Sequence, residues 1–214
     1  MVKDEILNEL YFYKALGYRF IGGDAGRRGT SAPNLAALGA QISRCNLCPL
    51  AKTRQKIVRG AFCGSAPAPN PKVLVVAPNP SSANGWLNET LKILANIGVS
   101  ANEVYLTHLI KCDSNLNYKN GVNGENLTFC AAQCKEYLLD EIALLTPKIV
   151  LALGAKVFAE LCGETDCSFA SLRGGVFRSK SALVAPTHDP ALIASNPSLA
   201  AQFAQDVAKL KGYL

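Results

Sequence analysis

The stretch Thr146-Pro-Lys-Ile-Val-Leu-Ala-Leu-Gly154 decides the fold class of this 214-residue chain. Its apolar run, Ile149 to Leu153, has the length of a strand that is buried on both faces. A helical pattern of apolar residues begins directly after the glycine and covers Ala155 to Leu161. A buried strand that leads straight into a helix is typical of a parallel sheet covered by helices, so this unit predicts an α/β protein.

The same alternation continues on both sides of this unit. Further strands are predicted at Val73–Val76, Val104–Ile110 and Ala182–Ala185, and further helices at Leu87–Leu94, about Cys134 to Leu145, and Ser198–Lys211. The Ser198 hydroxyl can cap the first turn of its own helix. Connections of this kind are right-handed and place helices on both faces of the sheet. The predicted architecture is a three-layer α/β/α sandwich with a central, mostly parallel sheet.

The amino-terminal 40 residues differ from the rest of the chain. Asp4 to Leu16 has apolar residues at helical spacing and predicts an amphipathic helix, whereas Gly22 to Pro33 is rich in glycine and predicts a loop. We therefore expect a helical extension and loop over residues 1–40, followed by one α/β domain over residues 41–214. A chain of this length with 49% hydrophobic residues can bury one sizeable core.

Composition and the amino-terminal sequence exclude several classes of protein. No apolar run approaches the roughly 18 residues that a membrane span needs. The start of the chain contains Asp4, Glu5 and Glu9 instead of the basic and apolar regions of an export signal. We expect a cytoplasmic, monomeric protein without membrane contact. In a reducing cytosol, the eight cysteines favour metal binding or free thiols over disulfides.

Basic residues are unevenly distributed along the chain. From Ala25 to Asn88 there is no acidic residue, although the net charge of the whole chain is only +6. The basic residues of this segment are Arg27, Arg28, Arg44, Lys52, Arg54, Lys56, Arg59 and Lys72. Such a one-signed stretch attracts polyanions such as DNA, and a solvated basic face without a partner is the alternative.

Cysteine spacing indicates a metal centre. Cys45-Asn-Leu-Cys48 places two thiolates close enough to bind one centre. Cys112, Cys130 and Cys134 supply further candidates across a polar, asparagine-rich loop. Four thiolates suit zinc or a cubane iron-sulfur cluster about equally, and unrelated buried thiols are a further alternative.

Three loops follow predicted strands and contain polar residues that a simple turn does not need. They are Ala77–Gly85, His108–Cys112 and Thr187–Leu192. Ligands of parallel sheets bind beyond the carboxyl ends of the strands, where such loops converge. We therefore expect the ligand-binding site of this chain at that edge.

Six stretches occur, in the same order and at matching intervals, in one known family. They are C-x-x-C-P-L-A-K-T-R (Cys45–Arg54), V-Y-L-T-x-L-I-K-C (Val104–Cys112), C-K-E-Y-L-L-D-E-I (Cys134–Ile142), T-P-K-I-V-L-A-L-G (Thr146–Gly154), L-R-G (Leu172–Gly174) and P-T-x-x-P-A-L-I (Pro186–Ile193). Over about four-fifths of its length the chain thus resembles the iron-sulfur uracil-DNA glycosylases of bacteria and archaea, called family four.

The resemblance implies a uracil-DNA glycosylase-like fold, a DNA substrate and a 4Fe-4S cluster. It assigns the cluster to Cys45, Cys48, Cys112 and Cys134, because Cys134 lies just before the Glu-Tyr-Leu-Leu run, separated by one lysine, where the family has its fourth ligand. Cys130, four residues earlier, is then an extra thiol. Zinc stays the alternative to the cluster.

The first catalytic loop departs from the family. The relatives carry G-E-A-P-G where this chain has Ala77-Pro78-Asn79-Pro80-Ser81, so Pro78 replaces the glutamate. Asn79 matches the asparagine that orients the attacking water in mismatch-type and single-strand-selective glycosylases, and a turn-stabilising asparagine is the alternative. Ala77, Pro80 and Ser81 are implied to line the base pocket. The phenylalanine that stacks on uracil is missing, and the nearby Trp86 can supply a stacking face or simply pack.

The second and third loops depart as well. His108 stands where the relatives read the base with asparagine, and one imidazole cannot reproduce the paired donor and acceptor of an amide. In the last motif, T-Y-H-P in the relatives, Asp189 replaces the histidine that stabilises the uracil anion, and His188 can take over that role by a one-residue shift. Lys111 and Leu192 are implied to contact DNA, Leu192 as a wedge in the duplex, with a core leucine as the alternative.

Two functions from different classes follow from these residues. The first is a DNA glycosylase of base excision repair that hydrolyses the N-glycosidic bond of uracil or another deaminated base. The second is a catalytically silent iron-sulfur module that binds DNA on the same scaffold, and the replaced glutamate and histidine favour it. A redox or sensing role for the cluster is a weaker third interpretation, because no partner motif accompanies it.

Overall fold

The computed structural model describes residues 32–80, 86–113, 124–163, 167–179 and 182–214. The helix predicted at Asp4–Leu16 and most of the loop predicted at Gly22–Pro33 lie outside the described residues. Among the helices of the described part, none combines the length and apolar character that a membrane crossing requires.

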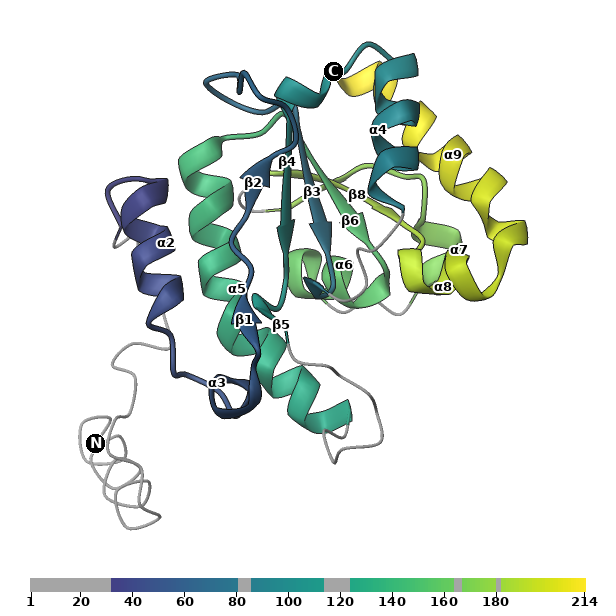
Figure 1. Cartoon of the computed structure of the whole chain (residues 1–214). Coiled ribbons are helices and arrows are strands. Elements are labelled where there is room, and N and C mark those ends of the chain that lie inside the picture. Colours follow the sequence, from purple (N-terminus) through teal and green to yellow (C-terminus); the bar gives the residue numbers. More distant parts are fainter. Residues whose placement is uncertain (1–31, 81–85, 114–123, 164–166, 180–181) are drawn as a thin grey trace, which may run out of the picture.

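A mostly parallel sheet forms the centre of the molecule (Figure 1). Within the described residues its six strands lie in the order β2-β4-β3-β6-β8-β7. Their bounds, in that order, are Ala61–Phe62, Val104–His108, Val73–Ala77, Ile149–Leu153, Leu183–Thr187 and Phe177–Arg178. The four central strands run parallel, and the short edge strands β2 and β7 are antiparallel to their neighbours. The predicted fold class is confirmed.

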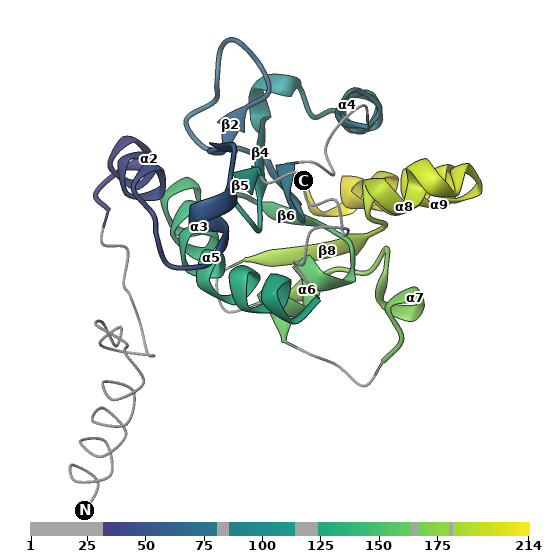
Figure 2. The same cartoon turned by 60° about the horizontal axis from the view of Figure 1, so that its bottom comes forward.

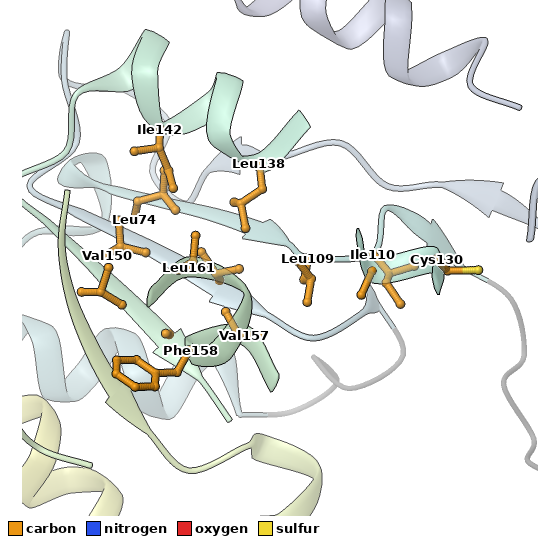
Figure 3. Close-up of a cluster of buried hydrophobic side chains, with 14 of the residues drawn as sticks. Leu74, Leu109, Ile110, Cys130, Leu138, Ile142, Val150, Val157, Phe158 and Leu161 are labelled. Carbon is orange, nitrogen blue, oxygen red and sulfur yellow. The ribbon is translucent and has the colours of Figure 1, made fainter. Parts of the chain in front are cut away.

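Helices cover both faces of this sheet (Figure 2). On one face, Leu74 and Val150 pack against α5 (Gly124–Leu145) and α6 (Ala155–Cys162), as Figure 3 shows. On the other, Val73 and Ile149 belong to a second core with α4 (Leu87–Asn96) and α9 (Ala200–Ala208). Side chains of a strand alternate between its two faces, so two apolar layers explain why β3 and β6 are apolar at every position.

A small region containing cysteines lies beside the sheet. It consists of residues 45–49, α3 (Leu50–Thr53) with Arg54, β1 (Lys56–Ile57), Lys111 with β5 (Cys112–Asp113), and the adjoining part of α5 (Figure 1). β1 pairs antiparallel with β5, which places Ile57 opposite Cys112. We call this part of the molecule the cysteine region.

Helix α2 (Leu35–Ser43) connects the amino-terminal segment to the domain. The Asn34 side chain caps its start by accepting a hydrogen bond from the Ala37 amide at 2.9 Å. Its buried Leu38 and Ile42 form a third core with Tyr137 of α5. The domain boundary predicted at residue 40 falls inside this helix, and the division of the chain stays a prediction.

Several element ends differ from the prediction. Strand β4 ends at His108 instead of Ile110, and α5 begins ten residues before the predicted start at Cys134. The last helix is split, with α9 preceded by a 3₁₀ turn at Pro197–Leu199 and followed by another at Lys209–Tyr213. The predicted cap at Ser198 is wrong, because its hydroxyl donates to Asn196 Oδ1 at 2.6 Å and α9 has no side-chain cap.

Candidate functional site

The first and second loops meet at the carboxyl ends of β3 and β4. In the parallel register Ala77 lies opposite His108, the last residue of each strand. Beyond the strands, the Leu109 amide donates to the Ala77 carbonyl at 2.8 Å and the Ile110 amide to the Pro78 carbonyl at 3.0 Å. These bonds fix the two loops to each other.

The third loop is fixed to the start of α6. The Gly154 amide donates to the Thr187 carbonyl at 2.8 Å. Gly154 has φ +90°, and a Cβ at this position would lie 3.2 Å from Asp189 Cβ, so glycine suits both the backbone and the close contact. Three strand spacings, about 14 Å, separate the ends of β4 and β8. The loops therefore line one edge of the sheet, as predicted, and we call this edge the strand-end site.

The second loop contributes a buried histidine. His108 is 4% exposed, and neither ring nitrogen has a hydrogen-bond partner among the described residues. Burial lowers the pKa of His108 to about 4, and the positive charge of Lys111 adds to this, while Asp113 opposes it. At neutral pH the imidazole is therefore uncharged, with one nitrogen that donates and one that accepts.

Lys111 takes a structural position. It is 2% exposed, and its ammonium lies 2.6 Å from Glu141 Oε2 of α5 and 2.6 Å from Thr107 Oγ1. Thr107 also donates to the same carboxylate oxygen at 2.7 Å. The prediction that Lys111 contacts DNA is wrong, because a buried and paired ammonium cannot reach a phosphate.

The third loop contains the pair that replaces the tyrosine and histidine of the relatives. His188 is 8% exposed, and its Nε2 lies 3.1 Å from Gln202 Oε1 of α9, whereas Nδ1 has no partner among the described residues. Asp189 caps α8 (Pro190–Ser195), since its Oδ1 accepts from the Ala191 amide at 2.9 Å. Burial raises the pKa of Asp189, and the bond from Ala191 lowers it by a smaller amount. A helix cap thus explains the aspartate without a catalytic role.

A buried hydrogen-bond network around Asp206 also holds the third loop in place. Asp206 of α9 is 4% exposed and accepts from Thr187 Oγ1 at 3.0 Å and from Arg173 Nη1 at 2.9 Å. Gln202 and Asp206 are one helical turn apart, so the same face of α9 holds both Thr187 and His188. The sequence analysis did not identify Gln202 or Asp206. The pattern that could have indicated them is a pair of polar residues on the otherwise apolar face of α9.

The first loop is described in part. Asn79 and Pro80 are half-buried and lie directly after β3, while Ser81 lies outside the described residues. Trp86 begins α4 and packs against the second core, and its indole Nε1 is buried without a hydrogen-bond partner among the described residues. Leu192 on α8 is 48% exposed, which removes the alternative of a core leucine.

Unpartnered polar atoms are concentrated in this part of the molecule. Within the described residues, the buried side-chain nitrogen and oxygen atoms without a partner belong to Trp86, His108 and His188. All three were predicted from the sequence as base contacts or catalytic residues. Buried polar groups in folded proteins are almost always paired, so such a concentration is typical of a site that receives a ligand.

Five thiols gather in the cysteine region. Cys48, Cys112, Cys130 and Cys134 are buried, and Cys45 is half-buried. Burial raises the pKa of Cys134 to about 11, with further increases from Cys112 and Cys48, while a backbone hydrogen bond from Lys111 lowers it. Burial also raises the pKa of Cys112, with smaller increases from Cys48 and Cys45. The thiols thus lie close enough to influence one another electrostatically.

The Arg54 guanidinium contacts two of these cysteines, which lie far apart in the sequence. Arg54 Nη1 donates to the Cys45 carbonyl at 2.7 Å and lies 3.8 Å from Cys112 Sγ. This positive charge lowers the pKa of Cys112 against the effect of burial, as a thiolate ligand requires.

The cysteine donor set is compatible with a cluster. Among the described residues, no three Cys, His, Asp or Glu side chains converge as ligands of one metal ion must. Each cysteine of a cubane cluster binds a different iron, so its thiolates stand further apart than those of a zinc site. Buried thiols in one neighbourhood that do not meet at a point are compatible with that larger group.

The basic stretch is divided between surface and structural roles. Arg44, Lys52 and Arg59 are exposed. Lys56 pairs with Asp113 at 3.4 Å and Lys72 with Glu103 at 2.7 Å. Exposed cations therefore remain in the described part of the basic stretch, and Arg27 and Arg28 lie outside the described residues.

Fold and site together define a member of the uracil-DNA glycosylase superfamily, and the chain belongs to this family, whose model matches residues 58–211. A Type-4 uracil-DNA glycosylase of Pyrobaculum aerophilum is 28% identical over 194 residues, which cover 84% of this chain and 94% of that relative. Type-4 uracil-DNA glycosylases of Sulfurisphaera tokodaii and Saccharolobus solfataricus are each 26% identical, with 83% of this chain covered and 84% and 85% of the relatives. The resemblance to family four is confirmed.

Proposed function

We propose that this chain is a DNA glycosylase that hydrolyses the N-glycosidic bond of uracil in DNA. The observation that carries this proposal is the set of buried, unpartnered nitrogens of Trp86, His108 and His188 at one edge of a uracil-DNA glycosylase fold. The names of the Type-4 relatives support uracil as the base. We extend the proposal to other deaminated bases, and to a place in base excision repair, because the loop that reads the base is changed.

In this proposal the base, turned out of the DNA, lies over the ends of β3 and β6 between His108 and His188. Uracil offers a carbonyl oxygen and an N–H at its polar edge. The neutral imidazole of His108 can satisfy either of these groups, whereas an amide satisfies both. We therefore expect weaker discrimination among bases that share this edge than in relatives with asparagine.

Bond cleavage needs a positioned water and stabilisation of the departing base. Asn79 lies two residues past β3, where its amide can orient a water without deprotonating it. His188 Nδ1 can donate to the oxygen of the leaving base. This requires a proton on Nδ1, which the ring has when it is doubly protonated or when the Gln202 amide is turned to donate to Nε2.

We also propose a 4Fe-4S cluster bound by Cys45, Cys48, Cys112 and Cys134, with zinc as the alternative. The buried thiols and the Arg54 contact to Cys112 support this ligand set. When bound, such a cluster supplies a covalent tie between chain segments far apart in sequence. Here it would join α3, β5 and α5 and hold the exposed Arg44 and Lys52 beside the strand-end site.

The test is a panel of oligonucleotides that contain uracil, hypoxanthine or xanthine, in single strands and duplexes. Full-length protein with a full complement of iron is incubated with each, and alkaline cleavage reveals abasic sites. We expect product from uracil. Absence of product from every substrate would refute the proposed activity.

A catalytically silent DNA-binding module is the second candidate. Pro78 replaces the family's glutamate, and Asp189 serves as a helix cap where the family has its histidine. This candidate predicts binding to DNA that weakens steeply with salt, and no abasic product.

A further inference from the structure

Cys130 is a buried thiol that the four-ligand set does not use. It is 1% exposed and belongs to the same core cluster as Cys48 and Cys112. Figure 3 shows it at the end of that cluster beside Ile110, two residues before Cys112. Its side chain lies within hydrogen-bonding reach of Cys48.

Its place on α5 relates Cys130 directly to the fourth ligand. Cys130 and Cys134 are four residues apart and both buried, so they share one face of the helix. Side chains at this spacing have Cβ atoms about 5–6 Å apart. A shift of about that size would bring Cys130 to the position that Cys134 occupies.

We propose that Cys130 is a reserve ligand, which binds the iron that Cys134 leaves open when that thiolate is lost. This inference rests on the proposed cluster. When Cys130 binds, its S–H proton is released to solvent and one Fe–S bond forms. The cluster then has the same number of Fe–S(Cys) bonds and the same charge as when Cys134 is the ligand. The iron keeps its oxidation state.

Two features explain why Cys130 is held back in the intact protein. Cys130 is 1% exposed and lies in an apolar cluster with Leu50 and Ile110, and such surroundings disfavour a free thiolate. Cys134 also contacts the segment that contains Cys112. The backbone of Lys111, the residue before β5, hydrogen-bonds the Cys134 sulfur. Cys134 is thus preferred, and Cys130 stays beside it as a neutral thiol.

The test compares Cys134→Ala, Cys130→Ala and the double variant with full-length wild type after anaerobic reconstitution. Alanine is chosen because a serine oxygen can itself bind iron, and because alanine is the best helix former. Iron, acid-labile sulfide and the visible absorption spectrum are measured. We expect both single variants to keep at least half of the wild-type iron, and the double variant to lose more than tenfold. Cys162→Ala, a half-buried thiol outside the cysteine region, is the matched control.

The outcomes separate this inference from the proposed cofactor. Iron in the wild type but none in Cys134→Ala would overturn the reserve ligand and leave the cluster in place. No iron in the wild type would overturn the proposed cluster as well. If circular dichroism shows that Cys134→Ala does not fold, alkylation of Cys130 in Cys134→Val, which also lacks a ligand atom and is closer in size to cysteine, decides: protection in the loaded protein that is lost after chelation supports the inference, and equal labelling refutes it.

Discussion

The cysteine region and the strand-end site differ in whether their buried polar groups have hydrogen-bond partners. In the cysteine region, Arg54 bonds to a carbonyl and a sulfur, and Lys111 is held between Glu141 and Thr107. At the strand ends, the ring nitrogens of His108 and one nitrogen of His188 have no partner among the described residues. Satisfied groups give a rigid scaffold, whereas unpartnered buried groups cost free energy unless a ligand pairs with them. The difference supports our proposal that the first region holds the structure and the second contacts the base.

The largest expected effect is at the buried ion pair between Lys111 and Glu141. Lys111→Met leaves the Glu141 carboxylate buried and unpaired, which should lower the free energy of unfolding by about 3–5 kcal/mol. The double variant Lys111→Met/Glu141→Leu should recover most of that loss. Urea unfolding measures both. Lys92→Met, which breaks an exposed pair with Glu89, is the control and should cost under about 1 kcal/mol. Equal costs for the buried and the exposed pair would contradict this account of Lys111.

A smaller effect is expected from the titration of His108. Its folded pKa of about 4 lies below the ordinary value of 6.5, so between these values the unfolded chain binds a proton that the folded chain does not. Stability should therefore fall as pH drops, by about 2 kcal/mol between pH 7.5 and 5. The His108→Asn variant lacks this contribution. Parallel pH curves for wild type and variant would show that His108 is not buried as a neutral ring.

The smallest effect concerns Asp189. Removal of its cap by Asp189→Ala should lower stability by about 1 kcal/mol. Asp189→Ser can still accept the Ala191 bond and should restore most of it. If excision by the serine variant equals that of the wild type, Asp189 acts only as a cap. A serine variant that is stable but has lost more than about tenfold in excision rate would give the carboxylate a part in the reaction.

Sequence reasoning succeeded where a local pattern determines the structure. The runs of β3 and β6 are apolar at every position because both faces of the sheet are covered, and their bounds were predicted to within a residue. The convergence of three loops followed from the parallel sheet alone.

Errors arose where a distant residue decides the outcome. Lys111 looks like a DNA contact until Glu141, 30 residues later, is found to pair with it in the core. Gln202 and Asp206 gain their importance from the fold, which places α9 against the end of β8. A cap at Ser198 was plausible locally, but its hydroxyl bonds to Asn196 instead.

The most direct test of the division between scaffold and chemistry is single-turnover excision from a uracil oligonucleotide by wild type, His108→Ala and His108→Asn, each with equal iron content. Wild type should form abasic product. Loss of the buried imidazole in His108→Ala should slow excision by about 10- to 100-fold, and the amide of His108→Asn, which can pair with both groups of uracil, should match or exceed wild type. Unchanged excision by His108→Ala, or no product from wild type with full iron, would contradict the account.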